Sequence, residues 1–306
     1  MFTSFNARAV GLPSLPTDAT IDDAADAGFA AVDLMVRDLV RSGADLGQVR
    51  DRMARRGLVA GAFPMTMDWR GDEASFRRDL AELPGLARAA AGLGLTRTGT
   101  WVMPETPRMP VPGEDPAALR AEVAAFHVAR IGAIARVLAD YGIRLGLEVI
   151  GVASFGRGAG VPFVNRMGEV PATLGPLLDE PNVGYLVDVF HLHAADEPTG
   201  PALAGAAGRI VWAHVADLDP GFAGTRADIV DAERGLPGEH GAVDSRDFLA
   251  RLAALGFDGP VTAEPLAWCR SLVGLEPAAV ARRVKAALDA CWPTAGRGSG
   301  LEGDVQ

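Results

Sequence analysis

The sequence predicts an α/β fold, a (β/α)8 TIM barrel that forms a single domain over residues 1–293. Segments with strand and helix patterns alternate almost to the end of the chain, which indicates a parallel sheet. The strand-like segments are apolar runs without polar alternation, as is typical of strands covered on both faces. The length of 306 residues also fits such a barrel, which routinely exceeds about 250 residues as one domain.

An open doubly wound sheet is the alternative architecture. That fold usually carries a GxGxxG motif directly after its first strand, and no such motif follows a strand-like run here. The glycine-rich stretch Gly156–Gly160 lacks a strand–turn–helix setting and is interpreted as a loop. Residues from Thr294 onward have the composition of a disordered tail.

The strands and several helix ends follow from local patterns. Seven strands are predicted at Ala30–Val36, Leu58–Phe63, Arg97–Met103, Ile143–Ile150, Val183–Asp188, Ile210–Val215 and Gly259–Glu264, with an eighth, weaker one at Ala7–Leu12. Three helices are expected to begin at a capping residue and to stop at a glycine. Their starts and stops are Thr20–Asp23 with Gly28, Asp115–Pro116 with Gly142, and Asp244 or Ser245 with Gly256.

The charge of the chain argues against a nucleic-acid partner. The formal net charge is −10 and the pI is about 5.0, whereas phosphate backbones are bound by a surplus of lysine and arginine. No apolar run approaches the ~18 residues of a membrane-spanning helix, and the first residues lack the pattern of a secretion signal. We therefore expect a cytoplasmic protein without nucleic-acid or membrane partners.

Two scarce residue types narrow the chemistry further. Cys269 and Cys291 show no CxxC spacing and are interpreted as reduced, structural residues. The single lysine, Lys285, lies in an amphipathic segment near the C-terminus, on the outer layer of the predicted barrel. This position argues against Schiff-base chemistry, because that chemistry needs a lysine amine in a pocket.

Metal-ligand residue types stand at the ends of the last four predicted strands: Glu148, Asp188, His214 and Glu264. Active sites of this fold lie at the C-terminal ends of strands, and neighbouring strands are ~4.8 Å apart, so the four side chains can converge on one ion. Three carboxylates and one imidazole favour a divalent ion, Mn²⁺ or Mg²⁺ first, with Co²⁺ or Zn²⁺ as alternatives. Taken singly, Asp188 or Glu264 could instead cap the segment that follows it.

These motifs together resemble a known family. In chain order, "GLEVIG", "VDVFH", "AHVAD", "RGLPGEHGAVD" and "TAEP" are similar to the sugar isomerase/epimerase branch of the xylose isomerase-like barrels. That branch includes tagatose and psicose 3-epimerases, hydroxypyruvate isomerase, and inosose isomerases and dehydratases. The resemblance extends to about Trp292. It implies a metal-dependent enzyme of carbohydrate metabolism that acts on a small sugar or polyol, and barrels of this type often form homodimers.

The resemblance also implies roles for individual residues. One divalent metal ion would be held by Glu148, Asp188, His214 and Glu264. His191 would contact the bound substrate or a metal-bound water. Arg234 would hold a substrate hydroxyl, carboxylate or phosphate.

The remaining histidines have less defined roles. His240 is an extra residue in a loop that is one residue longer than the common family form, and it is either a substrate contact or exposed. His193 is expected on the exposed surface and His127 in helix packing. Endonuclease IV, a DNA-repair relative, uses extra histidines on early strands, where this chain reads "AFPM" and "TWVMP", so a DNA-repair role is not expected.

Other side chains have both a pocket role and a structural role open to them. Trp69, Trp101 and Phe155 are candidates for the wall of a sugar pocket, with core packing as the alternative for Trp101. Arg157 and Arg166 could reach an anionic substrate, although solvated arginines are the favoured interpretation.

The implied reaction is the isomerisation or epimerisation of a small ketose, inosose or related polyol. The metal would polarise the substrate oxygens, and Glu148 and Glu264 would serve as base and acid around a metal-stabilised enediolate. A lyase of the inosose or dehydroshikimate dehydratase type remains an alternative, because it begins with the same proton abstraction. A non-catalytic sugar-binding barrel is a further alternative, but it would be expected to lose one of the two glutamates.

Overall fold

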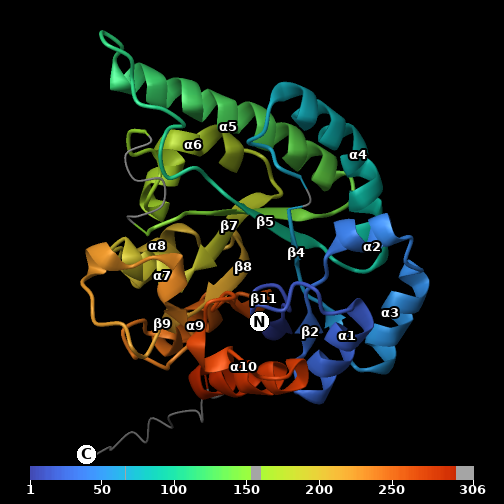
Figure 1. The fold of residues 1–306 in the computed structure, drawn as a ribbon. Helices are drawn as coiled ribbons and strands as arrows, with labels where there is room; N and C mark the ends of the chain where they lie inside the picture. Colours follow the sequence, from blue (N-terminus) through green and yellow to red (C-terminus); the bar gives the residue numbers. More distant parts are fainter. Residues whose placement is uncertain (66, 153–159, 294–306) are drawn as a thin grey trace, which may run out of the picture.

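The protein is described by a computed structural model over residues 1–65, 67–152 and 160–293. Parallel strands form a central barrel, and helices form a ring around it (Figure 1), which confirms the predicted fold. Phe155, Arg157, most of the Gly156–Gly160 loop and the expected tail from Thr294 lie outside the described residues.

The described strands are short, as is usual for a barrel. They are β1 (Phe2–Phe5), β2 (Ala31–Val32), β3 (Val59–Ala60), β4 (Phe63–Pro64), β5 (Arg97–Trp101), β6 (Arg144–Glu148), β7 (Val183–Asp188), β8 (Ile210–Val215), β9 (Asp217–Leu218), β10 (Arg234–Gly235) and β11 (Pro260–Ala263). The described helices are α1 (Thr17–Asp26), α2 (Val36–Ser42), α3 (Leu46–Arg55), α4 (Glu73–Gly92), α5 (Pro116–Ala139), α6 (Val170–Leu178), α7 (Val189–Ala194), α8 (Thr199–Gly205), α9 (Ser245–Ala254) and α10 (Pro277–Cys291).

The barrel is closed by two strand fragments that share one position in the ring. The hydrogen-bonded order is β3-β2-β1-β11-β8-β7-β6-β5-β4, and β3 and β4 are separated in the chain only by Gly61 and Ala62. Gly61 N donates to Val32 O at 2.9 Å, and Leu34 N donates to Ala62 O at 3.2 Å, so the ladder continues through the gap. The predicted strand Leu58–Phe63 is therefore present as two pieces. The strands β9 and β10 form a separate antiparallel pair.

The predicted strand at Ala7–Leu12 is wrong, because the first strand is β1. Directly after β1, Oδ1 of Asn6 accepts hydrogen bonds from the backbone N–H groups of Arg8 and Ala9, both at 3.1 Å, which turns the chain. Gly11 then has a φ of 82°, a left-handed conformation that does not occur in a strand.

The helix ends agree with the predictions at α5 and α9 and differ at α1. Asp115 caps α5 by accepting from Ala117 N at 2.9 Å, and Asp244 caps α9 by accepting from Asp247 N at 2.9 Å. The helix α1 begins earlier than the expected capping box, at Thr17 directly after Pro16, where no side chain forms a cap.

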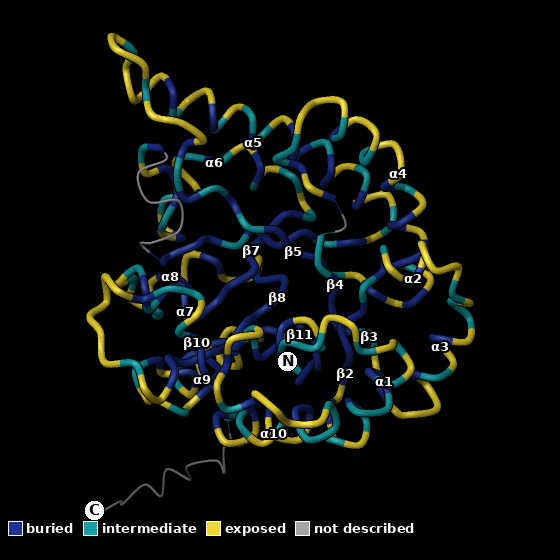
Figure 2. Tube along the Cα trace, viewed as in Figure 1, coloured by how far each residue is buried: buried dark blue, intermediate teal, exposed yellow. Residues whose placement is uncertain are grey.

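The inside of the barrel is filled by a small apolar layer under the strand ends. Leu186, Trp212 and Ala62 form this layer, and all three are buried. Side chains alternate along a strand, so Gly99 on β5 and Gly146 on β6 leave room for Leu186. A Cβ atom on Gly99 would lie 2.4 Å from Cδ1 of Leu186. The strands are buried throughout most of their length, while the outer faces of the helices are exposed (Figure 2).

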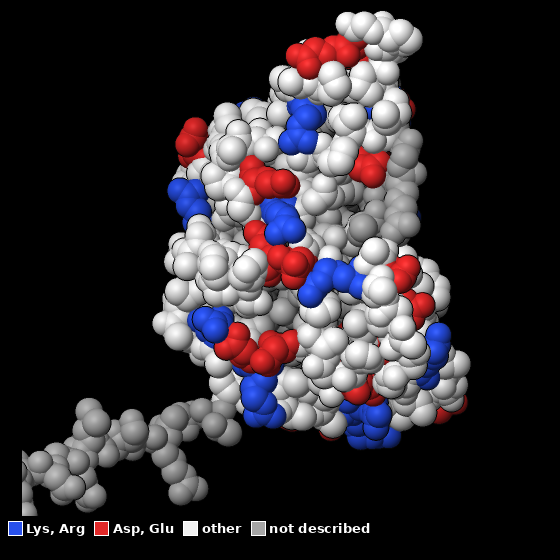
Figure 3. All heavy atoms as spheres, turned by 90° about the vertical axis from the view of Figure 1, so that its left-hand side faces the viewer, with Lys and Arg blue, Asp and Glu red and all other residues white. Residues whose placement is uncertain are grey.

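The surface carries charged side chains of both signs. Acidic and basic side chains are interspersed on the face shown in Figure 3. Among the described residues, no helix combines the length and the apolar character needed to cross a membrane.

Candidate active site

The four predicted metal ligands meet at one end of the barrel. Glu148 is the last residue of β6, Asp188 is the last of β7, His214 lies near the end of β8, and Glu264 follows β11 directly. His214 pairs with Asp188 on one side and with Thr262 on the other. Glu264 is two residues after Thr262, so it shares the inward face with the other three side chains.

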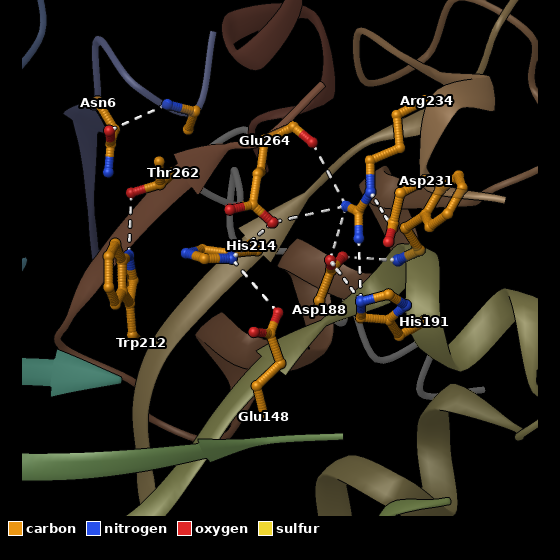
Figure 4. Close-up of polar contacts among 12 residues, drawn as sticks. Asn6, Glu148, Asp188, His191, Trp212, His214, Asp231, Arg234, Thr262 and Glu264 are labelled. Atoms are coloured by element: carbon orange, nitrogen blue, oxygen red, sulfur yellow. Dashed lines mark hydrogen bonds and ion pairs between the residues drawn. The ribbon is translucent and has the colours of Figure 1, made fainter. Parts of the chain in front are cut away.

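The ligand atoms are close enough to surround one ion. One nitrogen or oxygen atom of each of the four residues lies within 4.8 Å of those of the other three. Nδ1 of His214 is 3.2 Å from Oε2 of Glu264 and 3.7 Å from Oε1 of Glu148. The two glutamates approach His214 from opposite sides (Figure 4).

Arg234 lies beside the ligands, and other protein groups engage its guanidinium. Its side chain is 1% exposed, and its Nη1 is 2.7 Å from Oδ2 of Asp188. Nε donates to Oδ1 of Asp231 at 3.0 Å, and Nη2 lies 3.0 Å from Nε2 of His191. Because a guanidinium can only donate, Nε2 of His191 is the acceptor. Arg234 and His191 therefore contact each other beside Asp188. Their predicted contacts with substrate stay predictions.

The charges of the cluster suit a divalent cation. The ligands include three carboxylates, and the one positive charge of Arg234 beside them is shared with Asp231, so the ligands keep a net negative charge when His214 is neutral. Burying unpaired carboxylates costs free energy, and a divalent ion offsets that cost.

Neighbouring charges and burial shift the pKa values of the four ligands. Burial raises the pKa of Glu148. Burial would also raise the pKa of Asp188, but Arg234 and the nearby histidines outweigh it and lower this pKa to about 2. His214 and Arg234 outweigh burial at Glu264 as well, and its pKa is lowered. For His214, burial would lower the pKa, but Glu264 and Glu148 hold it well above its ordinary value.

An orphaned histidine provides an independent test of the metal site. Both ring nitrogens of His214 are buried, and neither makes a hydrogen bond with any residue that the structure describes. Buried polar atoms almost always have a partner, so a bound group such as a metal ion is expected at this imidazole. Oxygen ligands from three carboxylates and one histidine nitrogen fit Mn²⁺, Mg²⁺, Co²⁺ or Zn²⁺.

A cavity of about 340 Å³ opens next to the ligands. Three of them, Glu148, His214 and Glu264, line it, and the apolar layer of Leu186 and Trp212 also borders it. Apart from Leu266, the remaining lining residues come from the first half of the barrel and include Asn6, Arg8, Pro64, Met65, Met67, Arg70 and Trp101. The cavity volume lies in the range of sites that bind small molecules, and both glutamates border it.

The aromatic residues predicted for the pocket occupy different places. Trp101 lines the cavity, but the guanidinium of Arg70 lies 3.7 Å from the centre of its ring and so covers one face. Trp69 is fully buried, and its Nε1 donates to Oγ1 of Thr100 at 2.9 Å. Trp69 is therefore a core residue and not part of the cavity wall.

The other predicted polar residues lie away from the cavity. His240 is exposed, and its ring lies beside Phe222 with Nε2 3.3 Å from the carbonyl of that residue, so its predicted substrate contact stays a prediction. His193 is half-buried in α7 rather than exposed, and His127 is fully buried in α5. Arg166 is exposed and donates to the carbonyl of Asp196 at 3.2 Å.

The sequence predictions missed two arginines of the cavity wall, Arg8 and Arg70. Arg8 was missed because the first strand was predicted at Ala7–Leu12, so that Arg8 fell inside it and not after its end. In the structure Asn6 and Arg8 follow the end of β1 at Phe5. Arg70 lies in the loop after β4, a short strand that offers no clear pattern. With β1 at its correct position, the strand-end rule would have identified Asn6 and Arg8.

Comparisons with known proteins agree with the fold. The family described as xylose isomerase-like TIM barrel matches residues 21–291. A xylose isomerase domain protein from Alicyclobacillus acidocaldarius subsp. acidocaldarius has a similar structure, with 27% identity, a TM-score of 0.78, and coverage of 95% of this chain and 98% of its own. A search of curated proteins found no match.

Two further solved structures share the fold at lower identity. The IolI protein with a bound zinc atom is 18% identical, with a TM-score of 0.74 over 95% of this chain and 98% of that protein. D-psicose 3-epimerase with D-tagatose from Clostridium cellulolyticum H10 is 15% identical, with a TM-score of 0.68 over the same shares of the two chains.

Proposed function

The chain belongs to the family of xylose isomerase-like TIM barrels, and on that premise we propose a divalent-metal-dependent isomerase or epimerase of a small ketose, inosose or related polyol. The observation that carries the proposal is the arrangement of Glu148 and Glu264. Both carboxylates flank His214, and both line one cavity of the size of a small sugar. Two carboxylates at one reacting carbon are what an exchange of protons next to a carbonyl requires.

In the proposed reaction one glutamate removes the proton from the carbon beside the carbonyl, and the other returns a proton. An ion held by the four ligands would supply the positive charge that stabilises negative charge developing on the substrate oxygens. Arg234 keeps Asp188 ionised and in place through their 2.7 Å contact. Leu186 and Trp212 form an apolar side of the cavity, and apolar surroundings strengthen such electrostatic interactions.

The similar proteins support this class of reaction. One of them is a D-psicose 3-epimerase with D-tagatose, and another, IolI, binds zinc. The oxygen-rich ligand set leads us to propose Mn²⁺ or Mg²⁺ as the working ion, with Co²⁺ or Zn²⁺ as alternatives. We place the enzyme in carbohydrate metabolism in the cytoplasm.

The test measures metal content and proton exchange in the same preparations. The wild-type protein should contain about one divalent ion per chain by plasma mass spectrometry, as four converging ligands form a single site, and Glu148→Gln and His214→Ala should lose it. The metal-loaded enzyme should incorporate solvent deuterium into a ketose or inosose of a small panel. Glu264→Gln should abolish the exchange, whereas Glu82→Gln on the exposed face of α4 should leave it unchanged.

Each outcome has a distinct meaning. No metal after incubation with Mn²⁺ would refute the four-ligand site and the mechanism with it. The isomerase proposal would be refuted if the protein binds metal but exchanges deuterium with no member of the panel, and if Glu264→Gln is fully active in some other reaction. Release of an ultraviolet-absorbing enone would assign the site to a lyase, which starts from the same proton abstraction.

A further inference from the structure

We infer that the substrate carries an anionic group, a carboxylate or a phosphate, and that Arg8 and Arg70 bind it. The inference rests on the proposed function, because it specifies which polyol compounds fit the cavity. Both arginines line the cavity that Glu148 and Glu264 also line. They come from the half of the ring that contributes none of the four ligands: Arg8 follows β1, and Arg70 follows β4.

Arg70 is held in a fixed position. Its guanidinium lies 3.7 Å from the ring centre of Trp101 and 4.8 Å from that of Trp69. Its Nη1 donates to the backbone carbonyl of Trp101 at 3.1 Å, and the side chain is only 23% exposed. Contact with aromatic faces fixes the plane of a guanidinium while its edge remains available for hydrogen bonds.

Arg8 is anchored through its backbone. Oδ1 of Asn6 accepts from Arg8 N at 3.1 Å, and Nδ2 of Asn6 donates to Oδ2 of Asp33 at 3.3 Å. Asp33 is 2% exposed and also accepts from Oγ1 of Thr262 at 2.9 Å, which ties the turn to the barrel interior. The turn that carries Arg8 is therefore preformed, while its side chain is exposed.

Neither guanidinium is neutralised by a buried carboxylate. The carboxylate nearest to Arg70 is that of Asp68, at 3.5 Å, and Asp68 is 68% exposed. Arg8 forms no ion pair within 4.0 Å with any residue in the described ranges. Arg234, by contrast, is buried against Asp188. Arg8 thus has no ion pair among the described residues, and Arg70 has only the exposed Asp68 as its acidic partner. Two cationic groups in a cavity wall that are not neutralised by buried carboxylates are suited to an anionic ligand, which they would bind by charge-assisted hydrogen bonds.

The two arginines also border a second cavity of about 340 Å³. This cavity shares Arg8, Pro64, Met65, Met67 and Arg70 with the first, so the two cavities adjoin at these residues. A third arginine, Arg37, lines the second cavity but is paired with Asp79 at 3.3 Å. The anionic group would thus lie where the cavities adjoin, with the polyol chain extending toward Glu148 and Glu264.

The test compares three probes that cannot be turned over, because they lack a ketone: D-arabinitol, D-arabinonate and D-arabinitol 5-phosphate. Their affinities for the manganese-loaded protein are measured by calorimetry. At least one anionic probe should bind about tenfold or more tightly than D-arabinitol, since a hydrogen bond to a charged group is among the stronger ones. The probe that gains identifies the group as carboxylate or phosphate.

The variants separate the arginines from the metal as the source of selectivity. Arg70→Met and, as a second variant, the exposed Arg8→Met should each lower the affinity for the favoured anionic probe by about tenfold and leave that for D-arabinitol unchanged. Arg70→Lys should retain part of the preference, and Arg41→Met on α2 should retain all of it.

Equal binding of all three probes, or no binding of the anionic ones, overturns the inference, as does a preference that survives both methionine variants. Solvent deuterium exchange with ketoses is measured separately. Exchange without anion selectivity refutes the anion site alone. If the protein prefers an anionic probe but shows neither deuterium exchange nor bound metal, the proposed isomerase is refuted and the anion site is retained.

Discussion

Lowering the pH is expected to destabilise the fold through His127, a histidine that is buried as the neutral form. The ring lies in α5 between Trp69 and Phe163, with ring centres 4.8 and 4.9 Å away. Nδ1 lies 2.7 Å from the carbonyl of Val123, and Nε2 accepts from the backbone N–H of Met103 at 3.2 Å. The proton therefore resides on Nδ1, and a second proton on Nε2 would eliminate the bond from Met103.

The size of the effect follows from the pKa of His127. Burial, aided by the charge of Arg70, lowers this pKa from 6.5 to about 4. Because the unfolded chain takes up its proton first as the pH falls, the stability contributed by His127 is complete above pH 6.5 and is lost between 6.5 and about 4. Between about pH 7.5 and about pH 5.5, linkage gives a loss of about 1.3 kcal/mol in the free energy of unfolding.

The assay is urea unfolding followed by tryptophan fluorescence at several pH values for the wild-type protein, His127→Gln and Phe126→Leu. The difference between the wild-type protein and His127→Gln should shrink by about 1.3 kcal/mol as the pH falls over this range, since the variant lacks the titrating group. Phe126, whose ring centre is 6.2 Å from that of His127, has no proton to bind, so the curve of Phe126→Leu should parallel that of the wild-type protein. A difference that does not change with pH would refute this reasoning.

Three other perturbations test the barrel interior, the metal and a loop. Gly61→Ala should lower the free energy of unfolding by about 1–3 kcal/mol, because its Cβ would lie 2.2 Å from Oδ1 of Asp33; an unchanged urea midpoint would contradict this. Chelation with EDTA should lower the thermal midpoint of the wild-type protein, because an ion present at about 100 times its Kd adds about 2.7 kcal/mol to the free energy of unfolding. The midpoint of His214→Ala should not change, because this variant is expected to bind no ion. Asp217→Asn should cost about 1–3 kcal/mol, since the carboxylate accepts from four backbone N–H groups; the exposed Asp179→Asn is its control, and equal midpoints would argue against the role.

The agreement between sequence and structure depends on how local each signal is. The strands β7 and β8 coincide with the predicted runs residue for residue, because every residue in them is buried and most of their side chains are apolar. The candidate ligands Glu148, Asp188, His214 and Glu264 followed from the predicted strands that correspond to β6, β7, β8 and β11, since a residue at a strand end can be identified once the strand is placed approximately.

Features formed by long-range contacts could not be predicted in this way. The strand β1 has only four residues and gains its place by pairing with β11 and β2, which the sequence near it does not reveal. Arg8 and Arg70 are 62 residues apart (70 − 8), and only closure of the ring brings them to one cavity. The partners of Arg234 likewise depend on where the loop that leads to β10 returns to the barrel.

On the proposed function, substrate selection and proton transfer would depend on different parts of this barrel, and this separation can be measured. The ligands and their counter-charge Arg234 come from β6, β7, β8, β10 and β11, whereas Arg70 and Met67 belong to loops of the first half. Neither Arg70 nor Met67 is among the four ligands, so Arg70→Met and Met67→Ala should retain the full metal content while the range of polyols bound changes. Glu148→Gln should lose metal and turnover together. Loss of metal in Met67→Ala would show that the cavity wall supports the ligands after all, and the two functions would then not be separable.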